Sequence, residues 1–146
     1  MKSFRDAFRG ILTALGQERH MRFHLCMGYF VVWAGFVTRL SPGEWAAILL
    51  CLGLVASLEL VNTALERLCG QVTREYSPLI RTAKDCAAGA VLCSAIASAL
   101  VGCVVFFSQG RPALAMDYFL SHKAAWALFL PLPAMIYYVF KRSVHK

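Results

Sequence analysis

The feature that most constrains this chain is the uninterrupted apolar run at residues 86–107. It contains no charged residue, and it has the length of about 20 helical residues that crossing the hydrocarbon core of a membrane requires. A second apolar run begins at Trp45 and reaches about Ala64. A segment in lipid must satisfy its backbone polar groups internally, so both runs are expected to be transmembrane helices.

The composition indicates an integral membrane protein. Of 146 residues, 59% are hydrophobic and only 16% are charged, whereas about 25% of an ordinary soluble domain is charged. The six cysteines show neither CxxC nor Cys/His ligand spacing, so we expect packing residues rather than disulfides or zinc ligands. The net charge of +7 comes from basic residues scattered at the ends of apolar runs, which favours lipid headgroups over nucleic acid as the partner.

The N-terminal part of the chain predicts a helix that lies in the membrane interface. Residues 3–24 show helical periodicity, with Phe4, Phe8 and Ile11 on one side and charged residues elsewhere. The apolar run that follows, residues 25–37, is short, and it spans only if flanking residues are included. We therefore expect a surface helix followed by the first of three core transmembrane helices.

The C-terminal part predicts an extension beyond that core. Residues 124–140 form a fourth apolar run, in which Pro131 and Pro133 imply a kink. The predicted fold class is thus all-α integral membrane, with an N-terminal amphipathic surface helix, three core transmembrane helices and a fourth C-terminal transmembrane helix. We expect residues 1–108 to form the functional unit and residues 109–146 to form the extension.

The distribution of Lys and Arg predicts the orientation. If the four spans alternate in direction, one side receives nearly all of the 15 basic residues, and the other receives only Arg39, Arg111 and Lys123. Basic loops mark the cytoplasmic side. The N-terminal segment, the connector after the second span and the C-terminal tail are therefore predicted to be cytoplasmic.

One face of the second span carries polar groups that are costly in hydrocarbon. Glu59, Asn62 and Glu66 are spaced i, i+3, i+7, so they line one helical face. Glu59 lies about 7 to 8 Å before the cytoplasmic end of the span, near where a lipid hydroxyl sits. We expect Glu59 to act as a general base, Asn62 to orient it, and Glu66 to bind a divalent cation. The alternative is that these residues only join helices by hydrogen bonds.

Two further pairs of residues belong to the same cytoplasmic level. Glu18 and Arg22 lie one turn apart, and Glu18 supplies a second carboxylate for Mg²⁺ beside Glu66. Lys84 and Asp85 precede the third span, where a lysine can meet a phosphate. Taken singly, these pairs also fit a surface salt bridge, a positively charged anchor and a helix cap. Together they make up the groups that phosphoryl transfer requires.

These segments resemble a known family. "ELVNTALERL" at residues 59–68 and "EYSPLIRTAKDCAAGAVL" at residues 75–92 look like the signature of the small bacterial membrane kinases that include diacylglycerol kinase and undecaprenol kinase. "AFRGILTALGQERHMRFHL" at residues 7–25 resembles their surface helix, and the match covers roughly residues 4–107. The resemblance implies an ATP- and Mg²⁺-dependent lipid kinase, a homotrimer with active sites between protomers, in the bacterial inner membrane with its active site on the cytoplasmic side.

The resemblance also implies roles for individual residues. Glu59 matches the catalytic base and Asn62 its polar neighbour, while Glu18 and Glu66 match the metal-binding carboxylates. Contact with the lipid substrate is expected from Arg22 and Glu59. Contact with the nucleotide and its metal is expected from Glu18, Glu66, Glu75, Tyr76, Ser77, Lys84 and Asp85.

The sequence constrains the identity of the acceptor lipid and the role of the C-terminal extension less tightly. "RFHL", "NTALER" and "SPLIRTAKDCAAGAVL" look nearer to the undecaprenol kinase branch, with diacylglycerol as the alternative acceptor. The chain departs from the family at Gly70, where an Asp is common, and in its extra C-terminal segment. Those departures leave a non-catalytic membrane protein of the same fold as a second hypothesis. An ion conduit is a third, although it leaves Lys84 and Asp85 unexplained.

Overall fold

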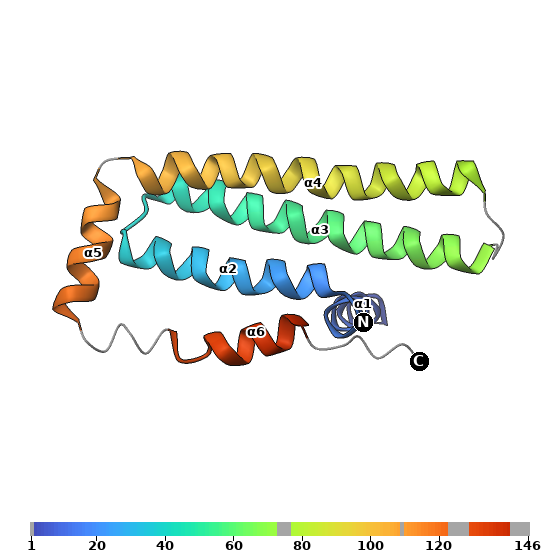
Figure 1. Ribbon diagram of the computed structural model, residues 1–146, viewed down its shortest axis with the longest axis horizontal. Helices are drawn as coiled ribbons and strands as arrows, with labels where there is room; N and C mark the ends of the chain where they lie inside the picture. The colour runs from blue at the N-terminus through green and yellow to red at the C-terminus, as the bar shows by residue number, and fades with distance from the viewer. Residues whose placement is uncertain (1, 73–76, 109, 123–128, 141–146) are drawn as a thin grey trace.

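The computed structural model describes residues 2–72, 77–108, 110–122 and 129–140, and over these ranges all regular structure is helical. Six α-helices are present in this described part of the chain (Figure 1). They are α1 (Lys2–Gln17), α2 (Arg19–Val37), α3 (Pro42–Val72), α4 (Pro78–Phe107), α5 (Arg111–Ser121) and α6 (Leu132–Phe140). The prediction of an all-helical protein is confirmed.

The two longest helices, α3 and α4, lie side by side and antiparallel (Figure 1). Within the described residues they are the two helices long and apolar enough to cross a membrane, over Pro42–Gln71 and Pro78–Phe107. Each of these stretches has 30 residues, so it is about 45 Å long, against about 30 Å of hydrocarbon. Their ends therefore extend past the hydrocarbon, and polar residues near the α3–α4 connection have access to water.

Both helices begin earlier than the apolar runs that predict them. α3 starts at a side-chain contact between Ser41 and Glu44, and α4 starts at a proline. Ser41 precedes α3, and its backbone N–H and hydroxyl both donate to Glu44 Oε2, at 2.8 and 2.7 Å. The N–H contact is one half of a capping box, the half in which the N3 carboxylate accepts from the N-cap backbone. At the start of α4, Pro78 follows an extended Ser77, an arrangement that suits the first helical turn.

The single surface helix predicted over residues 3–24 is instead two helices. α1 ends at Gln17, Glu18 has an extended backbone with φ −99° and ψ 121°, and α2 begins at Arg19. In Figure 1, α1 is seen nearly end-on next to the start of α2, so it runs crosswise to the bundle while α2 runs along it. We call the bend at Glu18 the elbow.

The predicted fourth span is described only in part, and it stays a prediction. Its described helical part is α6, which has 9 residues and is thus about 14 Å long, roughly half of the hydrocarbon thickness. Residues 123–128 lie outside the described residues. Pro131 lacks a backbone N–H and just precedes α6, which accounts for a helix starting late in the apolar run. α5, which the sequence analysis left as a connector, lies across the far end of the bundle, and α6 returns alongside α2 (Figure 1).

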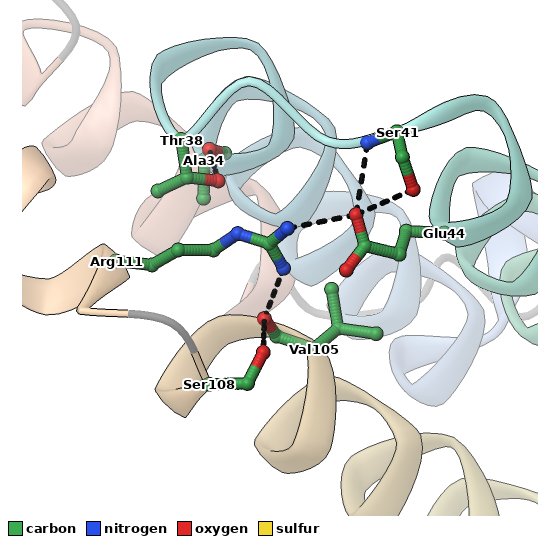
Figure 2. A network of polar contacts seen from close by, with 7 residues as sticks. All are labelled: Ala34, Thr38, Ser41, Glu44, Val105, Ser108 and Arg111. Carbon is green, nitrogen blue, oxygen red and sulfur yellow. Dashed lines mark hydrogen bonds and ion pairs between the residues drawn. The ribbon is translucent and has the colours of Figure 1, made fainter.

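The core of the bundle is at the end remote from the elbow. Leu40, Ile48 and Val105 form a buried apolar cluster there. Beside it, the buried guanidinium of Arg111 joins three elements, as Figure 2 shows. Its Nη2 lies 2.7 Å from Glu44 Oε2, and its Nη1 donates to the backbone carbonyl of Val105. The start of α5 is thereby fixed to α3 and α4.

Candidate active site

The centre of the candidate site is a buried pair of side chains from two helices. Glu59 on α3 is only 5% exposed. Its Oε1 lies 3.3 Å from Nε2 of His24, on α2, whose side chain is largely buried as well. The carboxylate that the sequence singles out therefore has an imidazole as its partner. The sequence analysis missed His24. A signal was present, because His24 is the last polar residue before the apolar run at 25–37 and ionisable residues at membrane depth are commonly functional.

Asn62 and Glu66 contact each other on the same face of α3. The Asn62 amide Nδ2 donates to Glu66 Oε1 at 3.5 Å. The contact that we expected between Asn62 and Glu59 is thus replaced by one to Glu66. The other amide atom, Oδ1 of Asn62, is buried and accepts no hydrogen bond from the part of the chain that the structure describes. Asn62 therefore presents a spare oxygen ligand beside the Glu66 carboxylate.

Glu18 lies at the elbow. Its chain neighbour Gln17 contacts α3, and this contact holds the elbow on the side of Glu66. Gln17 Oε1 accepts a hydrogen bond from Arg67 Nη2. Gln17 is adjacent to Glu18 in the chain, and Arg67 is adjacent to Glu66. Although Glu18 occupies the N-cap position of α2, its side chain makes no capping hydrogen bond. The two carboxylates predicted to bind the metal thus belong to segments that are tied together.

The predicted nucleotide residues of α4 lie at the same end of the bundle as Glu66, because α3 and α4 are antiparallel and joined near this end. Lys84 and Asp85 are both exposed. Asp85 Oδ2 is 3.8 Å from Arg81 Nε in an exposed ion pair, which contributes little to stability. Ser77 is at the N-cap position of α4, without a side-chain cap. Glu75 and Tyr76 lie outside the described residues.

Arg22 has contacts other than the lipid contact that we expected. It is 2% exposed. Its guanidinium donates to the backbone carbonyls of Leu15 and Gly16, at 3.5 and 3.2 Å, and to that of Val139, at 3.3 Å. These carbonyls belong to the last turns of α1 and α6. Arg22 therefore joins helix ends at the elbow.

A large apolar cavity, of about 1270 Å³, opens next to the buried pair. It is formed by side chains of α2, α3, α4 and α6. Residues that line it include Met21, His24, Leu52, Ala56, Ala99 and Tyr138. Because His24 both lines the cavity and contacts Glu59, one part of the cavity lies next to the partner of that carboxylate.

The donor set near the elbow suits a hard cation that brings ligands of its own. Among the described residues, no group of three or more His, Cys, Asp or Glu side chains is placed to hold a metal ion. Mg²⁺ typically takes one or two protein carboxylates and completes its octahedron with phosphate oxygens and water. Glu18, Glu66 and the unpaired Oδ1 of Asn62 are oxygen ligands of that kind. The residues present therefore fit Mg²⁺ bound together with a nucleotide.

The fold and the site define a small helical membrane enzyme with a buried carboxylate beside an apolar cavity. The chain belongs to the prokaryotic diacylglycerol kinase family, whose model matches residues 5–106, and it is a lipid kinase. The family resemblance predicted from the sequence is thus confirmed. Because its members are kinases, ATP is the implied phosphoryl donor.

Two relatives illustrate the similarity. The chain is 42% identical to an undecaprenol kinase of Bacillus subtilis over 108 residues, which cover 74% of this chain and 88% of that protein. It is 43% identical to a diacylglycerol kinase of Synechocystis sp. over 101 residues, which cover 68% of this chain and 58% of that protein. No solved structure matches the chain. The family match ends before α5, so α5 and α6 lie outside it.

Proposed function

We propose that this protein phosphorylates undecaprenol to undecaprenyl phosphate, with ATP as the donor and Mg²⁺ as the metal. The observation that carries the proposal is the position of Glu59, buried at 5% exposure and joined through His24 to an apolar cavity. A long prenyl chain suits a cavity with that lining, and its hydroxyl then lies beside the carboxylate. The undecaprenol kinase relative, aligned over 88% of its length, supports this acceptor.

In the proposed reaction, Glu59 accepts the proton of the lipid hydroxyl while the hydroxyl oxygen bonds to the γ-phosphorus of ATP. The bond from that phosphorus to the bridging oxygen breaks, and ADP leaves. His24, donating from Nε2 to Oε1 of Glu59, holds the carboxylate in one orientation and leaves its second oxygen for the proton. Holding both reactants in place supplies much of the acceleration in such transfers.

At the polar end of the site, we assign Glu18, Glu66 and Asn62 to the metal and Lys84 to the phosphates. A bound Mg²⁺ offsets the negative charge that develops on the phosphoryl oxygens. Asp85 and Ser77 complete the nucleotide contacts, and Glu75 and Tyr76 of the connector are assigned there too. Gly70 is compatible with this arrangement, because a Cβ added there meets no atom within 4 Å and an acidic side chain has room.

We further propose a homotrimer in the bacterial inner membrane, with α1 at the cytoplasmic surface and α2, α3 and α4 as the three core spans of a kinase unit formed by residues 1–108. Lys84 and Asp85 are exposed, so neither side chain is enclosed by its own chain. Their exposure supports the proposal that a neighbouring protomer completes each active site. Large exposed apolar side chains on α3 and α4, such as Leu50, Leu92 and Leu100, suit contact with lipid or with another protomer.

The test is a phosphoryl-transfer assay with the full chain in nanodiscs, using radiolabelled ATP and either undecaprenol or diacylglycerol. We expect labelled undecaprenyl phosphate, and at least a 100-fold loss in Glu59→Gln, the order expected for removing a general base. Asp117→Asn, a change of an exposed carboxylate on α5, is the matched control and retains activity. Full activity in Glu59→Gln would refute the assignment of the base.

Diacylglycerol is the second candidate acceptor, favoured by the family model and by the relative from Synechocystis sp.. The same assay separates the two, because phosphatidic acid and undecaprenyl phosphate migrate differently in thin-layer chromatography. If only phosphatidic acid carries the label, diacylglycerol is the acceptor in place of undecaprenol. The roles assigned to the residues then stay the same.

A further inference from the structure

The C-terminal extension returns to the elbow, where α1 meets α2. α6 packs against α2 in the opposite direction, so its last turn lies beside the first turn of α2 (Figure 1). Two polar side chains connect these segments, Arg22 from α2 and Tyr138 from α6. The match to the family model ends at residue 106, so α6 and its side of this contact lie outside it.

Arg22 joins the C-terminal ends of two helices. Carbonyls in a last helical turn lack partners inside the helix, and a cation near that end is stabilised by the helix dipole. The guanidinium reaches the carbonyls of Leu15 and Gly16 in α1 and that of Val139 in α6. A planar fork of N–H donors can serve carbonyls on two sides at once, whereas a lysine ammonium cannot match that geometry. Arg22 therefore links the end of α6 to the end of α1.

Tyr138 makes a second connection across the same junction. Its hydroxyl donates to the Leu15 carbonyl at 3.3 Å. The Arg22 guanidinium carbon lies 5.6 Å from the centroid of the Tyr138 ring, within the range of a cation–π contact. The last turn of α1 is thus held by both α2 and α6.

The elbow is the point at which such support matters. Glu18 is the single extended residue between α1 and α2, so its direction depends on how the two helices are held. The Gln17–Arg67 hydrogen bond fixes it from the α3 side, and the Arg22 and Tyr138 contacts fix it from the α6 side.

We propose that α6 positions Glu18 for its metal through Arg22 and Tyr138, so that the C-terminal extension sets the apparent affinity of the kinase for Mg²⁺·ATP. This inference rests on the proposed role of Glu18 as a metal ligand. Arg22 and Tyr138 are positioning residues, because their contacts are with the elbow rather than with the reacting groups.

Amide hydrogen exchange tests whether α6 holds the elbow, and it does not depend on enzyme turnover. The full chain is compared with Tyr138→Phe and Arg22→Lys, and Tyr137→Phe is the matched control because Tyr137 is 71% exposed. The reporters are amides of residues 14–22, where Glu18 N–H bonds to the Ala14 carbonyl and Arg22 N–H to the Glu18 carbonyl. We expect Tyr138→Phe to speed their exchange about 2- to 12-fold, as for one hydrogen bond of ordinary net strength. Unchanged exchange in both variants would overturn the proposal.

Enzyme kinetics test whether the elbow positions Glu18 for binding Mg²⁺. We expect Tyr138→Phe and Arg22→Lys to raise the Mg²⁺ concentration for half-maximal rate several-fold. The KM for the lipid should stay unchanged in Arg22→Lys, whereas it does not discriminate for Tyr138→Phe, because Tyr138 also lines the apolar cavity. Faster exchange with an unaltered Mg²⁺ requirement would overturn the positioning role. If the unaltered protein showed no turnover, the proposed function would fail, and the exchange comparison would still decide whether α6 holds the elbow.

Discussion

The imidazole Nε2 of His24 lies 3.3 Å from Oε1 of Glu59, across the interface between α2 and α3. Two ionisable side chains that are mostly buried thus depend on each other for polar contact. A hydrogen bond to a charged group contributes about 1.5–3 kcal/mol, more than one between neutral groups. The pair therefore fixes both the orientation of the carboxylate and the register of the two helices.

The first prediction concerns this pair. His24→Ala removes the group that orients Glu59, so we expect kcat to fall about 10- to 100-fold, the range equivalent to one hydrogen bond to a charge. His24→Gln, whose amide can still donate to Glu59, should recover part of the loss. His122→Ala, at an exposed position directly after α5, is the control. An unchanged kcat in His24→Ala would show that Glu59 needs no partner.

The second prediction concerns the oxygen of Asn62 that lacks a partner within the described residues. If it contributes to the metal site with Glu66, Asn62→Ala should raise the Mg²⁺ concentration for half-maximal rate roughly 10-fold, a size typical of lost support at a metal site. Gln71→Ala alters an exposed amide nearer the end of α3 and should leave that concentration unchanged. The measurement is a Mg²⁺ titration at saturating lipid. Equal titrations for both variants would remove Asn62 from the metal site.

The third prediction concerns stability at the far end of the bundle. Glu44→Ala leaves the buried Arg111 without its anionic partner, so the free energy of unfolding should fall clearly more than it does when an exposed ion pair is broken. Asp6→Ala breaks an exposed pair with Arg9, whose N–O distance is 3.1 Å, and should cost less than about 1 kcal/mol. Denaturant titrations in detergent measure both. Similar values for the two variants would mean that the Arg111 contact adds nothing.

The fourth prediction concerns close packing between helices. A Cβ on Gly35 would lie 2.7 Å from Cη2 of Trp45, so Gly35→Ala forces the indole or a helix to move. Such overpacking typically costs about 1–3 kcal/mol. Gly53→Ala adds the same methyl group to a position with no atom within 4 Å, and it should be neutral or stabilising because alanine favours helices. The same denaturant titrations compare them, and equal stability would contradict the crowding at Gly35.

The long helices could be predicted from the sequence, whereas the bends between helices could not. α3 and α4 follow from apolar runs whose length alone requires a helix in lipid. The break at Glu18 leaves no such signal, because helical periodicity continues on both sides of it. The elbow is held by carbonyl contacts of Arg22 and Tyr138, which come from segments distant in the sequence. A local pattern does not contain that information.

The site was predictable in part for the same reason. The i, i+3, i+7 spacing places Glu59, Asn62 and Glu66 on one face, as the structure does with the Asn62–Glu66 contact. Spacing along one helix does not identify which helix packs against that face. The contact of His24 with Glu59, the lining of the cavity and the buried contacts of Arg22 therefore became visible only with the tertiary arrangement.

The Arg111–Glu44 contact and the apolar cluster of Leu40, Ile48 and Val105 share the end of the bundle that is farther from Glu59. Helices clamped at one end separate most readily at the other. Loosening between α2 and α3 should therefore begin towards the elbow, where the His24–Glu59 contact is a polar link between them.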